Sequence, residues 1–143
     1  MKRILLFILT TLLSLFITAS CSILAGNGSN QLNNTSWRLI SYGEKQPIPG
    51  KDMTAKFDSQ EVSGSASCNH YFGSYQIRGD QFSVDGLGWT EMACLDPEGI
   101  MEQEQEIMGM LGDSITFTVQ GNILEILTSG GEAMIFEAIN SQK

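Results

Sequence analysis

The chain has 143 residues, 42% hydrophobic and 17% charged, which is enough apolar material for one domain with a core and argues against global disorder. Lys2 and Arg3 are two of its 8 basic residues, and all 16 acidic residues follow them, so the remainder carries a net charge of −10. Phosphate binding needs a basic surface, so this charge argues against a nucleic-acid partner and against adsorption to anionic lipid head groups.

The first 20 residues are typical of a bacterial lipoprotein signal peptide. A basic pair precedes an apolar run at residues 4–17, which is shorter than the roughly 20 residues that a bilayer span needs. The small residues 18–20 follow, and then Cys21, a pattern that resembles a lipobox with Thr18 where leucine is usual. We expect cleavage before Cys21 and lipidation of this residue; the alternative is an ordinary secretory peptide cut after Ala25.

A lipidated Cys21 would anchor the protein to a membrane of the bacterial cell envelope. The residue after it, Ser22, resembles the outer-membrane sorting pattern, so in a Gram-negative source the protein would face the periplasm from the outer membrane. Residues 21–31 are small and polar, and such a composition buries too little apolar surface to fold, so we expect a flexible tether. The folded domain is expected over residues 32–139.

Short stretches in which apolar residues alternate follow the tether, and each predicts a β-strand. The expected strands are 36–42, 53–57, 61–65, 71–77, 81–84, 115–119, 123–128 and 133–138. The pairs Asp85-Gly86 and Gly121-Asn122 are expected to be turns. Inside strands, Gly64 indicates a close backbone approach or a bulge, and Gly73 takes the place of an inward side chain. Many short strands at this spacing predict a barrel or a sandwich.

One helix is expected between the strands. Asp96 suits the N-cap, Pro97 suits the first helical position, and Gly112 suits the left-handed residue that ends many helices. One face is apolar, formed by Ile100, Met101, Ile107, Met108 and Leu111. We expect this face to close one side or end of the barrel. The polar residues should mostly face solvent: Glu98, Glu102, Gln103, Glu104, Gln105 and Glu106.

Three blocks of the expected domain carry a recognisable pattern. Residues 34–39 read NTSWRL, residues 64–75 read GSASCNHYFGSY, and residues 90–111 read TEMACLDPEGIMEQEQEIMGML. In order and spacing these blocks resemble the L-x-G-T-W-x-L opening, the G-x-x-x-CN-x-x-x-G-x-Y block and the T-x-MAC-x-x-P-x-x-M-x-QE block of the META domain family, which includes the heat-inducible protein HslJ. Ser36 lies at or beside the family's usual threonine.

The resemblance covers nearly the whole expected domain and implies its fold class: mainly β with one α-helix, a small lipocalin-like antiparallel β-barrel closed by that helix. It also implies a bacterial envelope or secreted protein associated with stress responses. No enzymatic activity or cofactor is established for the family, so the resemblance implies neither a catalytic residue nor a cofactor.

Two cysteines of the expected domain, Cys68 and Cys94, are the sharpest candidates for chemistry. If Cys21 is lipidated, these two remain, and export would place them in an oxidising compartment where they can form a disulfide. The alternatives are two unpaired buried thiols, or a redox or metal pair in which His70 supplies a third ligand. Neither a C-x-x-C motif nor a four-ligand zinc spacing is present, so we predict a structural disulfide and no metal site.

The turn around Asn69, His70 and Tyr71 is the candidate binding surface, because loops on a rigid barrel commonly carry function. We recognise no P-loop, no H-E-x-x-H motif and no G-x-S-x-G motif, which leaves hydrolase chemistry without a visible basis. Three functions stay open: a noncatalytic stress-tolerance lipoprotein that binds an envelope partner, a barrel that binds a small apolar ligand, and a thiol or metal protein that uses Cys68 and Cys94. A core filled by Trp37, Phe57, Tyr75, Phe117 and Phe136 would leave no room for a ligand.

Overall fold

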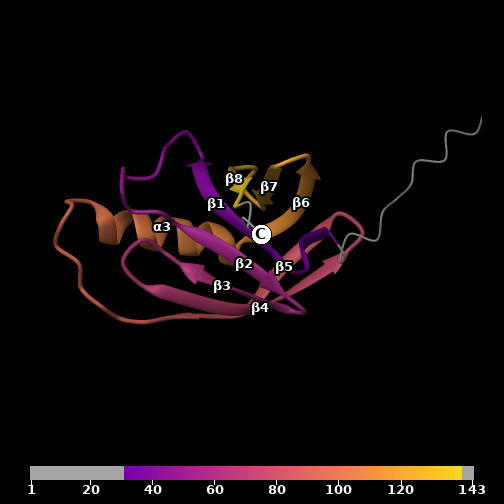
Figure 1. Ribbon diagram of the computed structural model, residues 1–143, viewed down its shortest axis with the longest axis horizontal. Helices are drawn as coiled ribbons and strands as arrows, with labels where there is room; N and C mark the ends of the chain where they lie inside the picture. Colours follow the sequence, from indigo (N-terminus) through magenta and orange to yellow (C-terminus); the bar gives the residue numbers. More distant parts are fainter. Residues whose placement is uncertain (1–30, 140–143) are drawn as a thin grey trace, which may run out of the picture.

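The computed structural model describes residues 31–139, and it shows a small closed β-barrel with one helix beside it (Figure 1). In chain order the elements of this part are β1 (Thr35–Tyr42), β2 (Thr54–Asp58), β3 (Glu61–Ser65), β4 (His70–Arg78), β5 (Gln81–Trp89), α3 (Ile100–Gly112), β6 (Ser114–Gln120), β7 (Ile123–Thr128) and β8 (Ala133–Ala138). The predicted fold class, mainly β with one α-helix in a closed antiparallel barrel, is confirmed.

Each strand of the barrel pairs antiparallel with the next, and β8 returns to pair with β1. The pairing is extensive except between β5 and β6, which share the single register position Gln81 with Thr116. The chain leaves the barrel after Trp89, at the other end of β5, forms α3, and returns as β6. Within residues 31–139, no helix has the length and apolarity that crossing a membrane requires.

Aromatic rings fill the interior of the barrel. The ring of Phe57 lies edge-on to that of Tyr75 at 5.1 Å between centroids, and to that of Phe82 at 6.1 Å. The ring centroids of Phe82 and Phe117 are 6.0 Å apart. Edge-to-face and tilted contacts of this kind suit the quadrupoles of the rings and pack them densely. These side chains are joined in one core by Trp37, Leu39, Met53, Leu124, Ile126 and Phe136.

Gly64 of β3 and Gly73 of β4 occupy positions where a side chain would clash. A Cβ atom on Gly64 would lie 2.0 Å from the carbonyl oxygen of Thr54, so this glycine permits the close approach of two backbones that its place in a strand predicts. A Cβ atom on Gly73 would lie 2.9 Å from Cγ1 of Val84, and Gly73 faces the interior as predicted. The hairpin turn at Gly121-Asn122 is also confirmed.

One prediction about the strands is wrong, and a second strand has an irregularity that its sequence does not indicate. β5 does not end at Val84 but continues to Trp89, because Asp85-Gly86 forms an irregularity within the β4–β5 ladder instead of a turn. Between two register positions of this ladder, β5 contains one residue more than β4. Gly86 lies in this irregularity and has a φ of 63°, which a glycine adopts without strain. In β6 the register shifts between Ser114 and Thr116, so Ile115 turns outward and is exposed.

Both predicted ends of the helix also need correction. Residues Pro97 to Ile100 form a turn, in which the backbone N–H of Ile100 donates to the carbonyl oxygen of Pro97, and a cis peptide bond precedes Pro97. The N-cap is therefore Gly99, whose φ of 85° breaks the helical geometry, and not Asp96. Gly112 is the last helical residue and not a left-handed cap. Asp113 follows it as the C-cap and donates its N–H to the carbonyl of Gly109.

Candidate functional site

A disulfide joins Cys68, in the turn between β3 and β4, to Cys94, in the segment of residues 90–99 that leads from β5 to α3. We call this segment the 90–99 loop. The Cα atoms of the two cysteines are 6.1 Å apart, within the range that a bridge spans without backbone movement. The predicted pairing is present, and in this oxidised form both sulfur atoms are unavailable as metal ligands. The structure therefore shows neither unpaired thiols nor a pair of thiolates that could bind a metal at these two positions.

Asn69, which follows the first cysteine, holds the 90–99 loop by its side chain. Its Oδ1 accepts hydrogen bonds from the hydroxyl of Thr90 at 2.7 Å and from the backbone N–H of Met92 at 2.8 Å. Its Nδ2 donates to the carbonyl of Met92 at 3.1 Å and to Oε1 of Glu104 at 2.7 Å. The amide group thereby uses its two donors and accepts two bonds in a position that is 2% exposed.

Glu104 of α3 is the second residue of this hydrogen-bond network, and we call Asn69 and Glu104 with their hydrogen-bond partners the junction. It is 3% exposed, and its Oε2 accepts hydrogen bonds from the backbone N–H groups of Asn69 at 2.7 Å and Cys68 at 3.3 Å. A buried carboxylate needs such donors because burial removes its hydration. The junction thus fastens the helix, the β3–β4 turn and the 90–99 loop at one point.

The expectation that this polar helix face is solvated is therefore wrong for Glu104, and it is also wrong for Gln103. The side chain of Gln103 donates to the hydroxyl of Ser67 at 2.9 Å and accepts from the backbone N–H of Ile48 at 2.7 Å. Gln103 and Glu104 form the QE pair of the third sequence block that resembles the family. This pair was the only sign in the sequence that the two residues have a special role. A helical wheel could not reveal their burial, because the covering elements come from other parts of the chain.

The family described as META domain matches residues 30–141. The chain belongs to the META domain family. Three solved structures share the fold of this META domain. One, an NMR structure of a protein from Burkholderia xenovorans, has a TM-score of 0.64 and 23% identity, and the match covers 79% of this chain and 87% of that one.

A second NMR structure has a TM-score of 0.62 at 22% identity and covers 76% of this chain and 92% of that one. A crystal structure of a DUF4847 family protein from Bacteroides vulgatus has a TM-score of 0.59 at 15% identity, with 81% and 99% covered. At these identities the likeness concerns the fold of the META domain. No match was found among curated proteins.

The predicted binding surface of the META domain is only partly exposed. Asn69 and Tyr71 are each 2% exposed, so the expectation of a contact surface at these two residues is wrong. The hydroxyl of Tyr71 donates to the carbonyl of Thr54 at 2.9 Å, and burial raises the pKa of this tyrosine. His70 alone of the three is exposed, because its position in β4 alternates with its buried neighbours.

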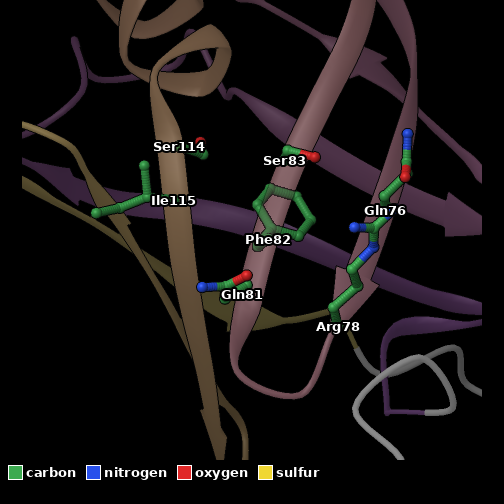
Figure 2. A pocket seen from close by; sticks show the side chains of 7 residues that line it. All are labelled: Gln76, Arg78, Gln81, Phe82, Ser83, Ser114 and Ile115. Carbon is green, nitrogen blue, oxygen red and sulfur yellow. The ribbon is translucent and has the colours of Figure 1, made fainter.

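A hollow of about 390 Å³ lies at the seam between β5 and β6 of the META domain (Figure 2). It exists because the two strands pair at one position and diverge from there. It opens outward, and its walls come from three strands: Gln76 and Arg78 of β4, Gln81, Phe82 and Ser83 of β5, and Ser114 and Ile115 of β6. Phe82 belongs to the aromatic core, so this hollow ends at a filled interior instead of leading into it.

Reduction of the disulfide should lower the free energy of unfolding of the META domain by roughly 3.5 kcal/mol, because the bridge closes a loop of 26 residues in the unfolded chain. Thermal unfolding with and without reductant measures the difference. The double variant Cys68→Ala/Cys94→Ala should show the lower stability with no further response to reductant. A melting temperature that reductant leaves unchanged in the unmodified protein would contradict the prediction.

Proposed function

We propose that this protein is a noncatalytic, lipid-anchored META domain of the bacterial cell envelope that acts in stress tolerance by binding another envelope component. The observation that carries the proposal over ligand transport is the filled barrel. Trp37, Phe57, Tyr75, Phe117 and Phe136 are all at most 4% exposed and belong to one core. A carrier barrel of this size needs an internal cavity, and here side chains take that space.

The chemistry of the junction supports binding over turnover. Its buried carboxylate, Glu104, is held by amide donors and contacts neither a nucleophile nor a base. His70 donates its backbone N–H to Thr90 at 3.2 Å, and among residues 31–139 no group of three metal-ligating side chains is close enough to hold a metal ion. A general base has to lie within hydrogen-bond reach of the group it activates, and Glu104 of the junction has no such group among its hydrogen-bond partners.

The anchor rests on Cys21, which lies outside the described residues, as do the proposed signal peptide (residues 1–20) and most of the tether. Cys21→Ser should move the protein from the membrane fraction to the soluble fraction of the envelope, because acyl chains on this residue would provide the attachment. Fractionation and intact-mass analysis measure the outcome. Native protein of unlipidated mass would contradict lipidation. In a Gram-negative source we propose that the domain faces the periplasm from the outer membrane.

The binding role is tested in intact cells. A photo-crosslinking amino acid is placed at one exposed position at a time around the barrel, in the full chain, and captured molecules are identified by mass spectrometry. One envelope protein captured reproducibly from one face, and a stress phenotype when that face is altered, supports the proposal. Purified protein that converts a substrate, in a manner abolished by His70→Ala, overturns the noncatalytic assignment.

A further inference from the structure

Three exposed apolar side chains, among them the two most exposed of residues 31–139, lie at one segment of the chain. Seven large apolar residues are exposed within residues 31–139, and three of them lie in or directly before the 90–99 loop. They are Trp89 at 46%, Met92 at 58% and Leu95 at 91%, the highest value of the seven. A leucine this exposed forgoes most of the roughly 1.5–3 kcal/mol that burial of its side chain would contribute.

The loop that carries these side chains is fixed and not free to fold inward. Cys94, the neighbour of Leu95, is bonded covalently to Cys68. Met92 is held at both its backbone N–H and its carbonyl by Asn69. The backbone N–H of Cys94 also lies 3.4 Å from Sδ of Met101 on α3. A surface held in this way loses little conformational entropy when a partner binds.

Acidic residues lie between and beside the apolar residues along the same segment of the chain. Glu91, Asp96 and Glu98 are exposed, and residues 89–99 contain no lysine, arginine or histidine. None of the three has a cationic partner within 4 Å among residues 31–139, whose two ion pairs are Arg38 with Glu137 and Lys45 with Glu106. Protein interfaces combine apolar side chains with a polar rim, and these three carboxylates can supply such a rim.

A hollow beside Trp89 completes this surface. It measures about 250 Å³, and Met101, Glu102, Glu104 and Gln105 of α3 line it together with Trp89. Trp89 and Met101 are its apolar lining residues, and the exposed Glu102 adds a fourth carboxylate to the rim. An apolar side chain of a partner can enter here while basic side chains pair with the rim. We call Trp89, Met92 and Leu95, with Glu91, Asp96 and Glu98, the loop surface.

We propose that the loop surface binds a protein segment that combines apolar and basic side chains. This inference rests on the proposed function and names the site and the chemistry of the partner. The charge selects the occupant: carboxylates without cations attract lysine and arginine, whereas they oppose an anionic membrane or a second copy of this acidic chain.

The test starts with a photo-crosslinking residue at Leu95 in the full chain, in intact cells. The matched control carries it at Ile115, which is 47% exposed but lies on β6 outside the loop surface. The crosslinked segment of the captured protein is identified, and a synthetic copy of it is titrated against the purified full chain. We expect capture at Leu95 and a segment that contains both apolar and basic residues.

The titration then separates the two parts of the loop surface. Leu95→Ser should weaken binding of the synthetic segment by about tenfold or more, as loss of a buried apolar anchor does. Asp96→Asn combined with Glu98→Gln should weaken binding at low salt and reduce its dependence on salt. Ile115→Ser should leave the affinity unchanged. Melting temperatures of all variants show whether each remains folded.

The outcomes distinguish this inference from the proposed function. Capture at other positions but not at Leu95 overturns the inference and leaves the binding role intact. No protein captured at any position overturns both. Capture of lipid or of a second copy at Leu95, a captured segment without basic residues, or a synthetic segment indifferent to Leu95→Ser overturns the inference.

Discussion

Asn69→Ala should lower the free energy of unfolding by more than about 4 kcal/mol, since the amide makes four hydrogen bonds in a position that excludes water, and each buried group left unpaired costs about 1–3 kcal/mol. Glu104 would lose one donor, and both backbone groups of Met92 would lose their partner. Chemical denaturation of the oxidised protein measures the change, because the disulfide keeps the loop tethered in the variant and isolates the contribution of the hydrogen bonds.

The matched control is the next residue along the chain. His70 is exposed, and its hydrogen bond to Thr90 comes from the backbone, so His70→Ala should change stability by less than about 0.5 kcal/mol. In a double-mutant cycle, Asn69→Ala combined with Glu104→Ala should cost less than the sum of the two single changes, because the two side chains share one bond. Equal stability of the Asn69→Ala variant and the unmodified protein would show that the junction does not hold the loop.

Gly64→Ala should destabilise the domain by about 4 kcal/mol or more, beyond the 1–3 kcal/mol typical of overpacking, because the added methyl group would meet a backbone atom and not a movable side chain. The carbonyl oxygen of Thr54 would lie 2.0 Å from the new Cβ and its carbon 2.8 Å away. Relief requires β2 and β3 to separate, and the ladder between these two strands is part of the closed barrel. Thermal or chemical denaturation measures the loss.

A second glycine gives the opposite expectation with the same chemical change. Gly109 lies in the interior of α3, and a Cβ atom there would meet nothing within 4 Å. Gly109→Ala should raise stability by about 0.5–1 kcal/mol, through helix propensity and the lower entropy of the unfolded chain. If both variants changed stability by the same amount and sign, the close approach at Gly64 would not be the cause.

The stability of the Asn69 variant also bears on function. If the junction serves to present the 90–99 loop, then Asn69→Ala should weaken a partner bound at the loop surface through disorder of Met92 and Leu95, not through loss of a direct contact. A phenotype of this variant is thus a structural effect, whereas Leu95→Ser removes a contact from a loop that stays in place. Comparing the two separates presentation from recognition.

Most elements of the barrel could be predicted from the sequence alone. Along β2 and β4 the inward-facing residues recur at every second position, and a strand with this period can turn only one of its faces toward a core. The spacing of the apolar residues in α3 likewise marked its buried face, and the cysteine count pointed to the bridge that is present. The three sequence blocks pointed to the META domain family, whose model matches residues 30–141, and they contain Gly64, Asn69 and Glu104, which the packing uses.

The tertiary structure alone decided which polar groups are buried. Glu104 lies among polar residues of the helix, whose periodicity assigns it to solvent, and Asn69 lies in a polar turn that was expected to be a contact surface. They are buried because segments 35 residues apart meet and satisfy each other's hydrogen bonds. The same holds for the start of α3, which a local capping rule places at Asp96 and the actual turn moves to Gly99. Local propensity is weak, at a few tenths to one or two kcal/mol per residue, and contacts between distant segments override it.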